Sequence, residues 1–317
     1  MRLDRIIALG VLVGMAAASA AYAQSYPTRP VRIVTTAPGA ANDRFARMIA
    51  QGLTDVFGKQ VIVDNRGGGI LAIDTVAKAT PDGYTVLLYS NGLWTLPLIQ
   101  KVSYDMGDFA PVTLVGRQPN VLVVHPGLGV ASVKDLIALA KAKPGQLNYG
   151  SGSTGSTPHI AGELFKNQAG VDIVRVAYKG AGPALTALLG GEVQLMFPTA
   201  GSAAPHVKSG KLKALAVTSA QPSELAPGLP TVAAAGLPGY ESIAPFGIFA
   251  PAGTPAAIVR RLSDEIGKVV NRADVKRRFF DNGVEVVGGA PEELAATIRS
   301  DTVRLTKLVK EAGLRAK

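Results

Sequence analysis

Short runs of β-branched residues alternate with stretches of helical hydrophobic periodicity along almost the whole chain after residue 25. This alternation is typical of parallel sheets whose strands are joined by crossover helices, and it predicts an α/β fold. We expect strands at Val31–Thr35, Val61–Asp64, Thr85–Tyr89, Val112–Val115, Val121–Val124, Leu147–Gly150, Ile173–Ala177, Leu195–Phe197, Ala214–Val217 and Gly247–Ala250. We expect helices at Asp43–Phe57, Ile70–Ala79, Val133–Lys143, Pro158–Ala169, Pro183–Gly190, Ala203–Lys208, Pro255–Arg272, Ala273–Asn282 and Pro291–Ala312.

Two apolar runs, at residues 120–124 and 246–250, differ from the other expected strands and suggest places where the chain crosses between two lobes. Such crossings would make hinge strands near 121–124 and 246–250. The first lobe would then comprise residues 26–120 plus 251–317, and the second lobe residues 125–245. Periodicity alone is equally compatible with two ordinary core strands, and a single large domain is the alternative.

The first 23 residues have the pattern of a secretory signal peptide. Arg2 and Arg5 precede the apolar run Ile6–Ala18, and Ala21-Tyr22-Ala23 fits a small-residue cleavage site. We therefore expect cleavage after Ala23 and a mature protein in the periplasm. The competing interpretation is a membrane anchor, but the apolar run is shorter than the roughly 20 residues that span a bilayer.

The composition excludes several classes of site. The chain contains no cysteine, which removes disulfides, zinc–thiolate sites and iron–sulfur ligation together. Its hydrophobic content of 47% supplies enough core for two domains, and its formal charge is +10, with the basic excess gathered late in the chain. Because aromatic residues are only 6% and no nucleic-acid-binding motif is present, we interpret these charges as solvated helix faces and expect no nucleic-acid partner.

A glycine- and hydroxyl-rich segment, residues 149–159, lies between an expected strand and an expected helix. Its glycines match G-x-G-x-x-G, but a dinucleotide site also needs an acidic residue about 20 positions later, and the next strand ends without one. The hydroxyl groups of Ser153, Thr154 and Ser156 instead accompany free amides at a helix start, which suits a small carboxylate. The alternative is that Ser156 and Thr157 only cap the helix.

A second helix start has the same character. The strand Val31–Thr35 runs into Pro38-Gly39, and a helical pattern opens near Asn42, so backbone N–H groups are offered to an anion. Two more glycine-bearing turns precede helices, at residues 178–183 and 199–202. Turns of this kind gather at the carboxyl ends of parallel strands, where ligands bind, so the four turns together predict one cleft.

Catalytic signatures are missing from the sequence. It contains no G-x-S-x-G, H-E-x-x-H or P-loop motif, and its three histidines are far apart. A periplasmic hydrolase that uses Ser156 and His159 is the alternative function, and a protein-binding module that uses the basic C-terminal helices is a third. The carboxylates do not bunch with a histidine, so we expect no metal, and nothing indicates a cofactor.

Many separate motifs resemble the Bug family of periplasmic solute-binding proteins, the TctC-like receptors of tripartite tricarboxylate transporters. They follow one another along essentially the whole mature chain: Asn65-Arg66-Gly67, Thr80–Thr85, Gly150–His159, Tyr178-Lys179-Gly180, Thr218-Ser219-Ala220, Leu229–Val232 and Ala250–Pro255. The resemblance implies a non-enzymatic clamshell of two lobes, each a mostly parallel sheet flanked by helices, which closes on one small organic acid. It also implies delivery of that acid to a membrane permease or a sensor protein, and we expect a monomer.

In this family, the turn after the first strand and the Gly/Ser/Thr loop of the second lobe hold a carboxylate between them. With the neighbouring turns, the resemblance implies these ligand-binding residues: Pro38, Gly39, Ala40, Ala41, Asn42, Asp43, Ser90, Ser153, Thr154, Gly155, Ser156, Thr157, His159, Tyr178, Pro198 and Thr199.

The chain departs from the family pattern in its first loop, at Ala40 and Asn42, which replace a glycine and a hydroxyl residue. The turn that starts at Asn65 is also shortened. Pro198 stands where many members have Asp, and without that carboxylate a ligand ammonium loses a partner, so we expect a plain acid rather than an amino acid. Trp94 and Phe246 either line the distal part of the cleft or belong to the core.

Overall fold

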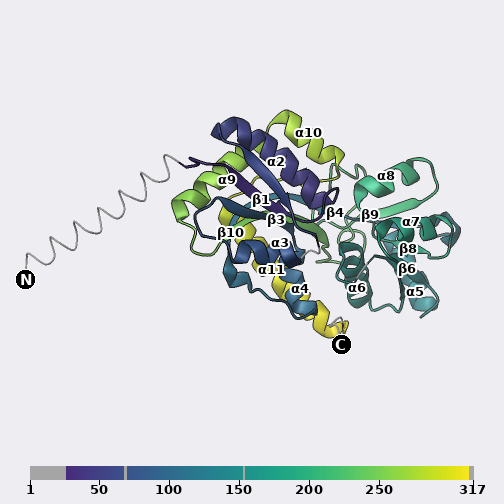
Figure 1. Cartoon of the computed structure of the whole chain (residues 1–317). Coiled ribbons are helices and arrows are strands. Elements are labelled where there is room, and N and C mark those ends of the chain that lie inside the picture. Colours follow the sequence, from purple (N-terminus) through teal and green to yellow (C-terminus); the bar gives the residue numbers. More distant parts are fainter. Residues whose placement is uncertain (1–25, 68–69, 153, 314–317) are drawn as a thin grey trace, which may run out of the picture.

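The computed structural model describes residues 26–67, 70–152 and 154–313, and it contains two β-sheets, each with helices on both faces (Figure 1). The expected signal peptide lies outside the described residues, as does Ser153. Within the described ranges, no helix has the length and apolarity needed to cross a bilayer.

The first sheet has six strands in the order β11-β4-β10-β3-β1-β2. The strands β1, β2 and β3 are parallel, whereas β10 runs antiparallel to both of its neighbours, β3 and β4. The bounds are β1 (Val31–Thr35), β2 (Val61–Asn65), β3 (Thr85–Ser90), β4 (Phe109–Pro119), β10 (Ile243–Pro251) and β11 (Glu285–Val286).

Helices pack on both faces of this sheet because its strands are apolar at consecutive positions. In β1, Ile33 joins the core under α2, α9 and α10, and the adjacent Val34 joins the core under α3, α4 and α11. The bounds are α2 (Ala41–Phe57), α3 (Ile70–Ala77), α4 (Gly92–Ile99), α9 (Ala256–Val270), α10 (Ala273–Asp281) and α11 (Pro291–Glu311).

The second sheet has five strands in the order β7-β6-β8-β5-β9. Helices α5 and α6 contribute to the core on one face, and α7 and α8 to the core on the other. The bounds are β5 (Val121–Val124), β6 (Asn148–Ser151), β7 (Val174–Ala177), β8 (Leu195–Met196), β9 (Lys213–Val217), α5 (Val133–Ala142), α6 (Thr157–Ala169), α7 (Ala181–Leu189) and α8 (Ala200–Lys208). Two short 3-10 helices are η1 (Met106–Asp108) and η2 (Pro126–Leu128).

Most strands of each sheet run in one direction, as expected, but both sheets are mixed. β5 runs antiparallel to β8 and β9, just as β10 runs antiparallel to β3 and β4. The chain leaves the first sheet at the carboxyl end of β4 and enters the second at the start of β5. Because β5 starts at the edge of the second sheet where β6 and β8 end, it runs opposite to them.

Every expected strand and helix is present, but α4 and β11 were not expected. Gly92 and Pro97 lie within α4, and both residues signal a helix interruption in a sequence. Pro97 has no N–H to donate to the Leu93 carbonyl oxygen, which instead accepts from the Tyr104 hydroxyl over 2.8 Å. β11 has two residues, too few for a periodic pattern.

The two crossing segments are joined by hydrogen bonds at Asn120, Thr218 and Ser242, all buried. The Asn120 amide donates to Thr218 Oγ1 over 2.8 Å, and Thr218 Oγ1 lies 2.6 Å from the Ser242 carbonyl oxygen. Residues 121–124 form β5 of the second sheet, and residues 246–250 lie within β10 of the first. The division into lobes at these segments, and their action as hinges, stays a prediction.

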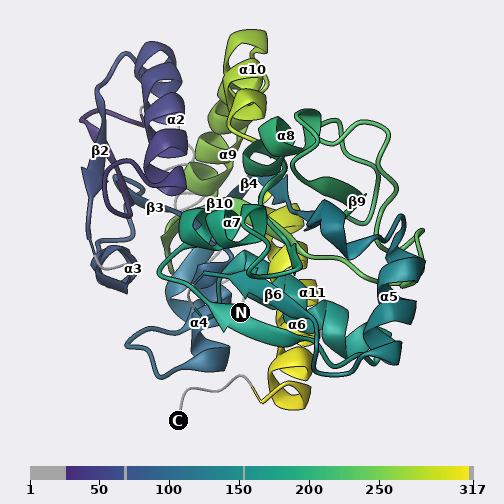
Figure 2. The ribbon, with the colours of Figure 1, turned by 90° about the vertical axis from the view of Figure 1, so that its right-hand side faces the viewer.

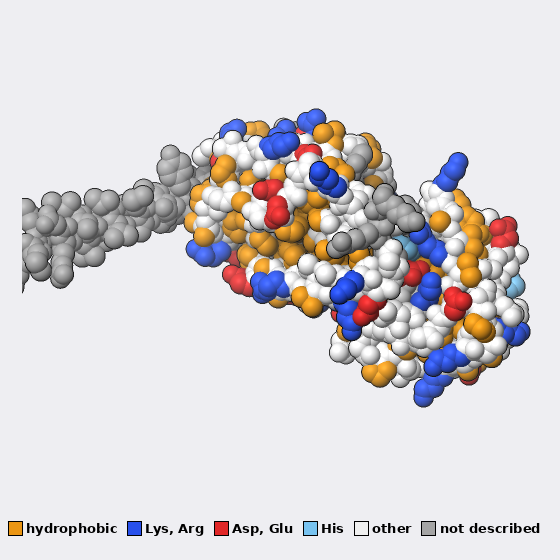
Figure 3. Space-filling model, turned by 90° about the horizontal axis from the view of Figure 1, so that it is seen from below, with side chains coloured by type: hydrophobic (Ala, Val, Ile, Leu, Met, Phe, Trp, Pro, Cys, Tyr) orange, Lys and Arg blue, Asp and Glu red, His pale blue; other side chains and the backbone are white. Residues whose placement is uncertain are grey.

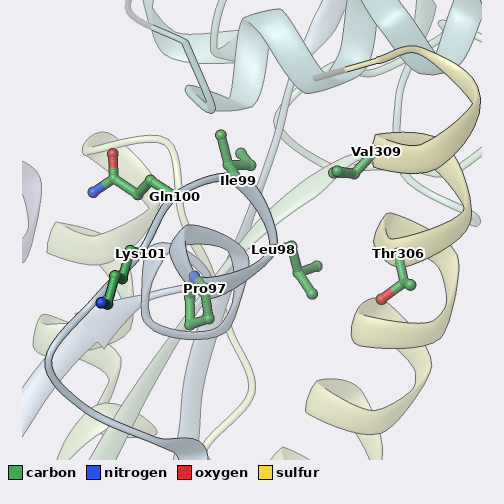
Figure 4. A pocket seen from close by; sticks show the side chains of 7 residues that line it. All are labelled: Pro97, Leu98, Ile99, Gln100, Lys101, Thr306 and Val309. Carbon is green, nitrogen blue, oxygen red and sulfur yellow. The ribbon is translucent and has the colours of Figure 1, made fainter. Parts of the chain in front are cut away.

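The C-terminal helix α11 contacts the cores of both sheets. Leu294, near its start, is buried among residues of α3 and α4, whereas Leu305 and Leu308 are buried with residues of α6. Figure 2 shows α11 passing beside α6. A cavity of about 420 Å³ lies between the end of α4 and the late turns of α11, with Leu98 directed toward Thr306 (Figure 4).

The late basic residues lie on α9, α10 and α11, where many form ion pairs with neighbours on the same helix. Arg277 Nε lies 3.0 Å from Asp281 Oδ1, and Lys268 Nζ lies 3.2 Å from Glu265 Oε1. On the face in Figure 3, Lys and Arg side chains are scattered among Asp and Glu rather than gathered into one block.

Candidate functional site

The strand directions bring most of the predicted site residues to two facing edges. The carboxyl ends of β1 and β3 lie at one edge of the first sheet, and those of β6, β7 and β8 lie at one edge of the second. The chain crosses between the sheets at these same edges, next to Asn120. Contact between the two sides is direct, since a Cβ on Gly155, in the loop after β6, would lie 3.1 Å from Ile99 Cδ1 in α4.

The first loop, residues 36–40, is shaped by Asp43 in the first turn of α2. Asp43 Oδ2 accepts a hydrogen bond from the Gly39 amide, and Oδ1 accepts one from Asn65 Nδ2, both over 2.8 Å. Arg47 Nε lies 2.9 Å from Oδ1. Both carboxylate oxygens therefore already accept bonds from protein groups, so the role of Asp43 is to hold the conformation of the loop.

Burial alone would raise the pKa of Asp43, but the hydrogen bonds from Asn65, Gly39 and Arg47 outweigh it and hold that pKa below its ordinary value. The turn itself needs Gly39, whose φ of +80° lies in the left-handed region. Ala40 occupies the N-cap of α2 without a side-chain capping bond. Pro38 precedes this turn and Ala41 is the first residue of α2, and neither side chain carries a hydrogen-bonding group.

Two buried polar atoms of this loop lack hydrogen-bond partners among the described residues, Thr36 Oγ1 and Asn42 Oδ1. Asn42 is 8% exposed and lies in the first turn of α2. A buried polar atom without a partner costs about 1–3 kcal/mol, so such atoms ordinarily meet water or a ligand. A flip of the Asn42 amide would present its NH₂ group, a donor, at the same place.

The second loop follows β6 and ends at the start of α6. Gly155 takes a φ of +81°, and its amide donates to His159 Nδ1 over 3.0 Å. The Gly155 amide, which the sequence suggested as a donor to an anion, is thus already bonded to His159. Thr157 is the first residue of α6, and Thr154 is exposed at the tip of the loop.

Ser156 occupies the N-cap of α6 but makes no capping bond, and its Oγ is buried without a partner among the described residues. It makes no hydrogen bond to His159, whose Nδ1 already accepts the Gly155 amide. The alternative, that Ser156 only caps the helix, is contradicted by the absence of that bond. The Ser156–His159 pair of the hydrolase alternative is likewise not formed.

His159 is buried, at 1% exposure, and stays neutral near physiological pH. Burial is the main cause that lowers its pKa to about 4, and the nearby Arg175 adds to this effect. Because Nδ1 accepts from a backbone N–H, the ring proton lies on Nε2.

Arg175, in β7, holds the second loop together, and sequence reasoning missed it. Its guanidinium donates three bonds, from Nε to Ser151 Oγ over 2.8 Å, from Nη2 to the Gly152 oxygen over 2.9 Å, and from Nη1 to Thr154 Oγ1 over 3.2 Å. The sequence carried no signal for this contact, because it depends on the pairing of β7 with β6.

Four further predicted residues lie at the same sheet edges and differ in burial and in hydrogen-bond partners: Ser90, Pro198, Thr199 and Tyr178. Ser90 ends β3 and is half-buried, and Pro198 is buried with its carbonyl oxygen 2.8 Å from the Val121 amide. Thr199 Oγ1 lies 2.9 Å from Ser202 Oγ. Tyr178 packs beside the core of α7, and burial, with the neighbouring Glu192, raises its pKa.

Trp94 and Phe246 belong to the core, which resolves the choice that the sequence left open. Trp94 is 1% exposed, and its Nε1 donates to Asp301 Oδ2 over 3.1 Å. Phe246 is 3% exposed and packs against Phe45 with the ring centroids 4.8 Å apart. In the part of the chain that the structure describes, no three His, Asp or Glu side chains are grouped as a metal site.

Comparison with known proteins agrees with this architecture. Residues 45–314 match the model of the tripartite tricarboxylate transporter family receptor, TctC. The chain is 35% identical to the protein BugT of Bordetella pertussis over 326 residues, which cover all of both chains.

The solved structures that are similar to it include three of particular interest. An R. palustris protein solved with adipate is 37% identical, with a TM-score of 0.76 over 91% of this chain and 98% of that one. MatC from Rhodopseudomonas palustris, solved with bound malate, is 30% identical, with a TM-score of 0.72 over 90% of this chain and 100% of that one. A TctC solute-binding protein from Polaromonas, solved without ligand, is 25% identical, with a TM-score of 0.81 over 90% of this chain and 99% of that one.

Proposed function

Because the chain belongs to the tripartite tricarboxylate transporter receptor family, which consists of solute-binding receptors rather than enzymes, we propose that it binds one small dicarboxylate between its two facing loops. Relatives of this chain have been solved with adipate and with malate, both of which are dicarboxylates. The predicted ligand-binding residues of the two loops make up the proposed site, with one carboxylate held at the helix starts of α2 and α6.

The observation that carries the proposal is the pair of buried, partnerless polar groups on opposite sides, Asn42 at the start of α2 and Ser156 at the start of α6. Helix starts attract anions through their free N–H groups and dipole. With the Asn42 amide flipped so that Nδ2 takes the place of Oδ1, a carboxylate that accepts from Asn42 and from Ser156 would satisfy groups that are otherwise costly to bury.

The energy of such a site suits reversible capture. Three to five charge-assisted hydrogen bonds at ~1.5–3 kcal/mol each give about 5–15 kcal/mol, similar to the ~4–15 kcal/mol cost of association. Apolar burial and closure of the two lobes would then decide the affinity. Closure would also create the surface that a membrane permease or a sensor protein recognises.

A plain acid suits this site better than an amino acid. Pro198 offers no carboxylate to a ligand ammonium, and the carboxylate of Asp43 is already held by Gly39, Asn65 and Arg47. We further propose that residues 1–23 are removed as a signal peptide and that the mature protein acts as a monomer in the periplasm.

Calorimetric titration tests the proposed function. The mature protein, freed of copurified ligand by unfolding and refolding, is titrated with adipate, malate, glutamate and the diamine putrescine. We expect binding of one dicarboxylate per chain and weaker or no binding of the amino acid and the diamine. Stronger binding of glutamate would overturn the argument from Pro198, and absence of binding to every acid would overturn the proposed function.

A variant with both loops changed, Asn42→Ala with Ser156→Ala, locates the site. We expect affinity for the dicarboxylate to fall by about tenfold or more, the value of at least one charge-assisted hydrogen bond. Thr75→Ala removes a hydroxyl from α3, where Thr75 Oγ1 donates to the Leu71 oxygen within the helix, and serves as the matched control. Equal affinity of the double variant and the control would remove these loops from the site.

A further inference from the structure

We propose that Arg175 is the positioning residue of the second loop and supplies the positive charge that favours a carboxylate there. This inference rests on the proposed function and extends it, because the sequence and the family pattern point to amides and hydroxyls but to no arginine. Its basis is the geometry of one guanidinium in a strand next to the loop.

The guanidinium contacts the loop on both sides of residue 153. It donates to the buried Ser151 hydroxyl and to the Gly152 carbonyl oxygen at the end of β6, and to the Thr154 hydroxyl further along. A single planar group with donors at fixed angles thus sets the distance between Gly152 and Thr154.

The sheet register explains why this arginine reaches the loop. β7 is an edge strand of the second sheet, and Arg175 lies opposite Tyr149 of β6, two residues before Ser151. Partner residues of parallel strands project from the same face, so the long side chain extends along β6 toward its carboxyl end. The near end of the loop also lies close to the turn before α7, since a Cβ on Gly152 would lie 3.4 Å from the carbonyl carbon of Gly180.

The charge of Arg175 is not compensated by contact with an acid in the described ranges. Its three bonds go to neutral oxygens, and no carboxylate there lies within ion-pair distance of it. The nearby acid, Glu163, is held by the Tyr149 hydroxyl over 2.5 Å and by Lys166 Nζ at 3.4 Å. An anion at the loop therefore meets an uncompensated positive charge at short range.

Two substitutions separate the geometry of Arg175 from its charge. Arg175→Met removes both, and Arg175→Lys keeps the charge but loses the planar fork. Arg277→Met, at an exposed arginine of α10 paired with Asp281, is the matched control. Each refolded protein is titrated with adipate and malate by calorimetry at several salt concentrations, and its unfolding midpoint is measured without ligand.

We expect Arg175→Met to weaken binding by about tenfold or more and to flatten the dependence of the dissociation constant on salt. Arg175→Lys should restore the salt dependence but not the full affinity, and Arg277→Met should match the wild type in both. A purely structural role would lower the unfolding midpoint and leave the salt dependence unchanged.

Binding by Arg175→Met within twofold of the wild type would overturn the inference, whereas failure of the wild-type protein to bind any acid would instead overturn the proposed function. If Arg175→Met does not fold, a double-mutant cycle of Arg175→Lys with Thr154→Ala replaces it. Positioning through Thr154 predicts that the arginine substitution costs less affinity once the hydroxyl is gone, and strictly additive losses would contradict it.

Discussion

Replacing Ser156 by alanine should make the ligand-free protein more stable while weakening its binding of a dicarboxylate. Ser156 Oγ is buried without a partner among the described residues, and it makes no capping bond to α6. A buried unsatisfied polar atom costs about 1–3 kcal/mol, so its removal should raise the free energy of unfolding by about 1 kcal/mol. The usual loss of ~0.5–2 kcal/mol on replacing an N-cap does not apply, because the cap is not used.

Ser132→Ala is the matched control for this prediction. Ser132 is the N-cap of α5, and its Oγ accepts from the Asp135 amide over 3.1 Å, so its loss should lower the free energy of unfolding by about 0.5–2 kcal/mol. Urea unfolding of both ligand-free variants gives the stability changes, and calorimetry gives the affinities. Ser156→Ala should lose about tenfold in affinity and Ser132→Ala none. Destabilisation of both variants by similar amounts, with unchanged affinity, would refute the reasoning.

Three further predictions concern stability and titration. Asp43→Asn should lower stability at neutral pH and remove a pH dependence of stability. The folded pKa of Asp43 is depressed, so the stability that Asp43 provides is full above its ordinary pKa of 3.8 and is lost as pH falls through the lower folded value. Urea unfolding of wild type and variant across that pH range measures the difference. His159 should remain neutral between about pH 5 and 8, because its folded pKa is lowered from 6.5 to about 4. Its contribution to stability is full above pH 6.5 and is lost as pH falls toward 4. An NMR titration in which the His159 ring signals move near pH 6.5 would contradict this prediction. Gly162→Ala should cost about 1–3 kcal/mol of stability, because a Cβ there would lie 2.3 Å from Tyr149 Cε2, whereas Gly182→Ala, with nothing within 4 Å, should be nearly neutral in the same unfolding assay.

The fold was largely predictable because its strands are short, apolar and bounded by turns. Ile33 and Val34 are buried on opposite faces of one strand, which is the pattern that a strand buried on both sides produces. The direction of the crossing strands was not predictable, since a strand such as β5 reads the same whether it runs parallel or antiparallel. Helix α4 was not predicted, because Gly92 and Pro97 indicate a helix interruption within its eight largely apolar residues.

The candidate site was predictable only where chemistry and turn signals coincide along the chain. Asn42 and Ser156 follow turns directly, so their positions at helix starts could be inferred from local sequence. The contacts of Arg175 could not, and neither could those of Thr218 between the crossing segments, because they depend on strand pairing and on segments about 20 and 100 residues away, which no local pattern encodes.

A crystal structure of the refolded mature protein with adipate tests the central claim most directly. The proposed function predicts one ligand between the loops after β1 and β6, with a carboxylate oxygen within hydrogen-bond distance, about 2.5–3.2 Å, of Ser156 Oγ and of the Asn42 side chain. A ligand bound elsewhere, for example in the cavity between α4 and α11, would contradict it.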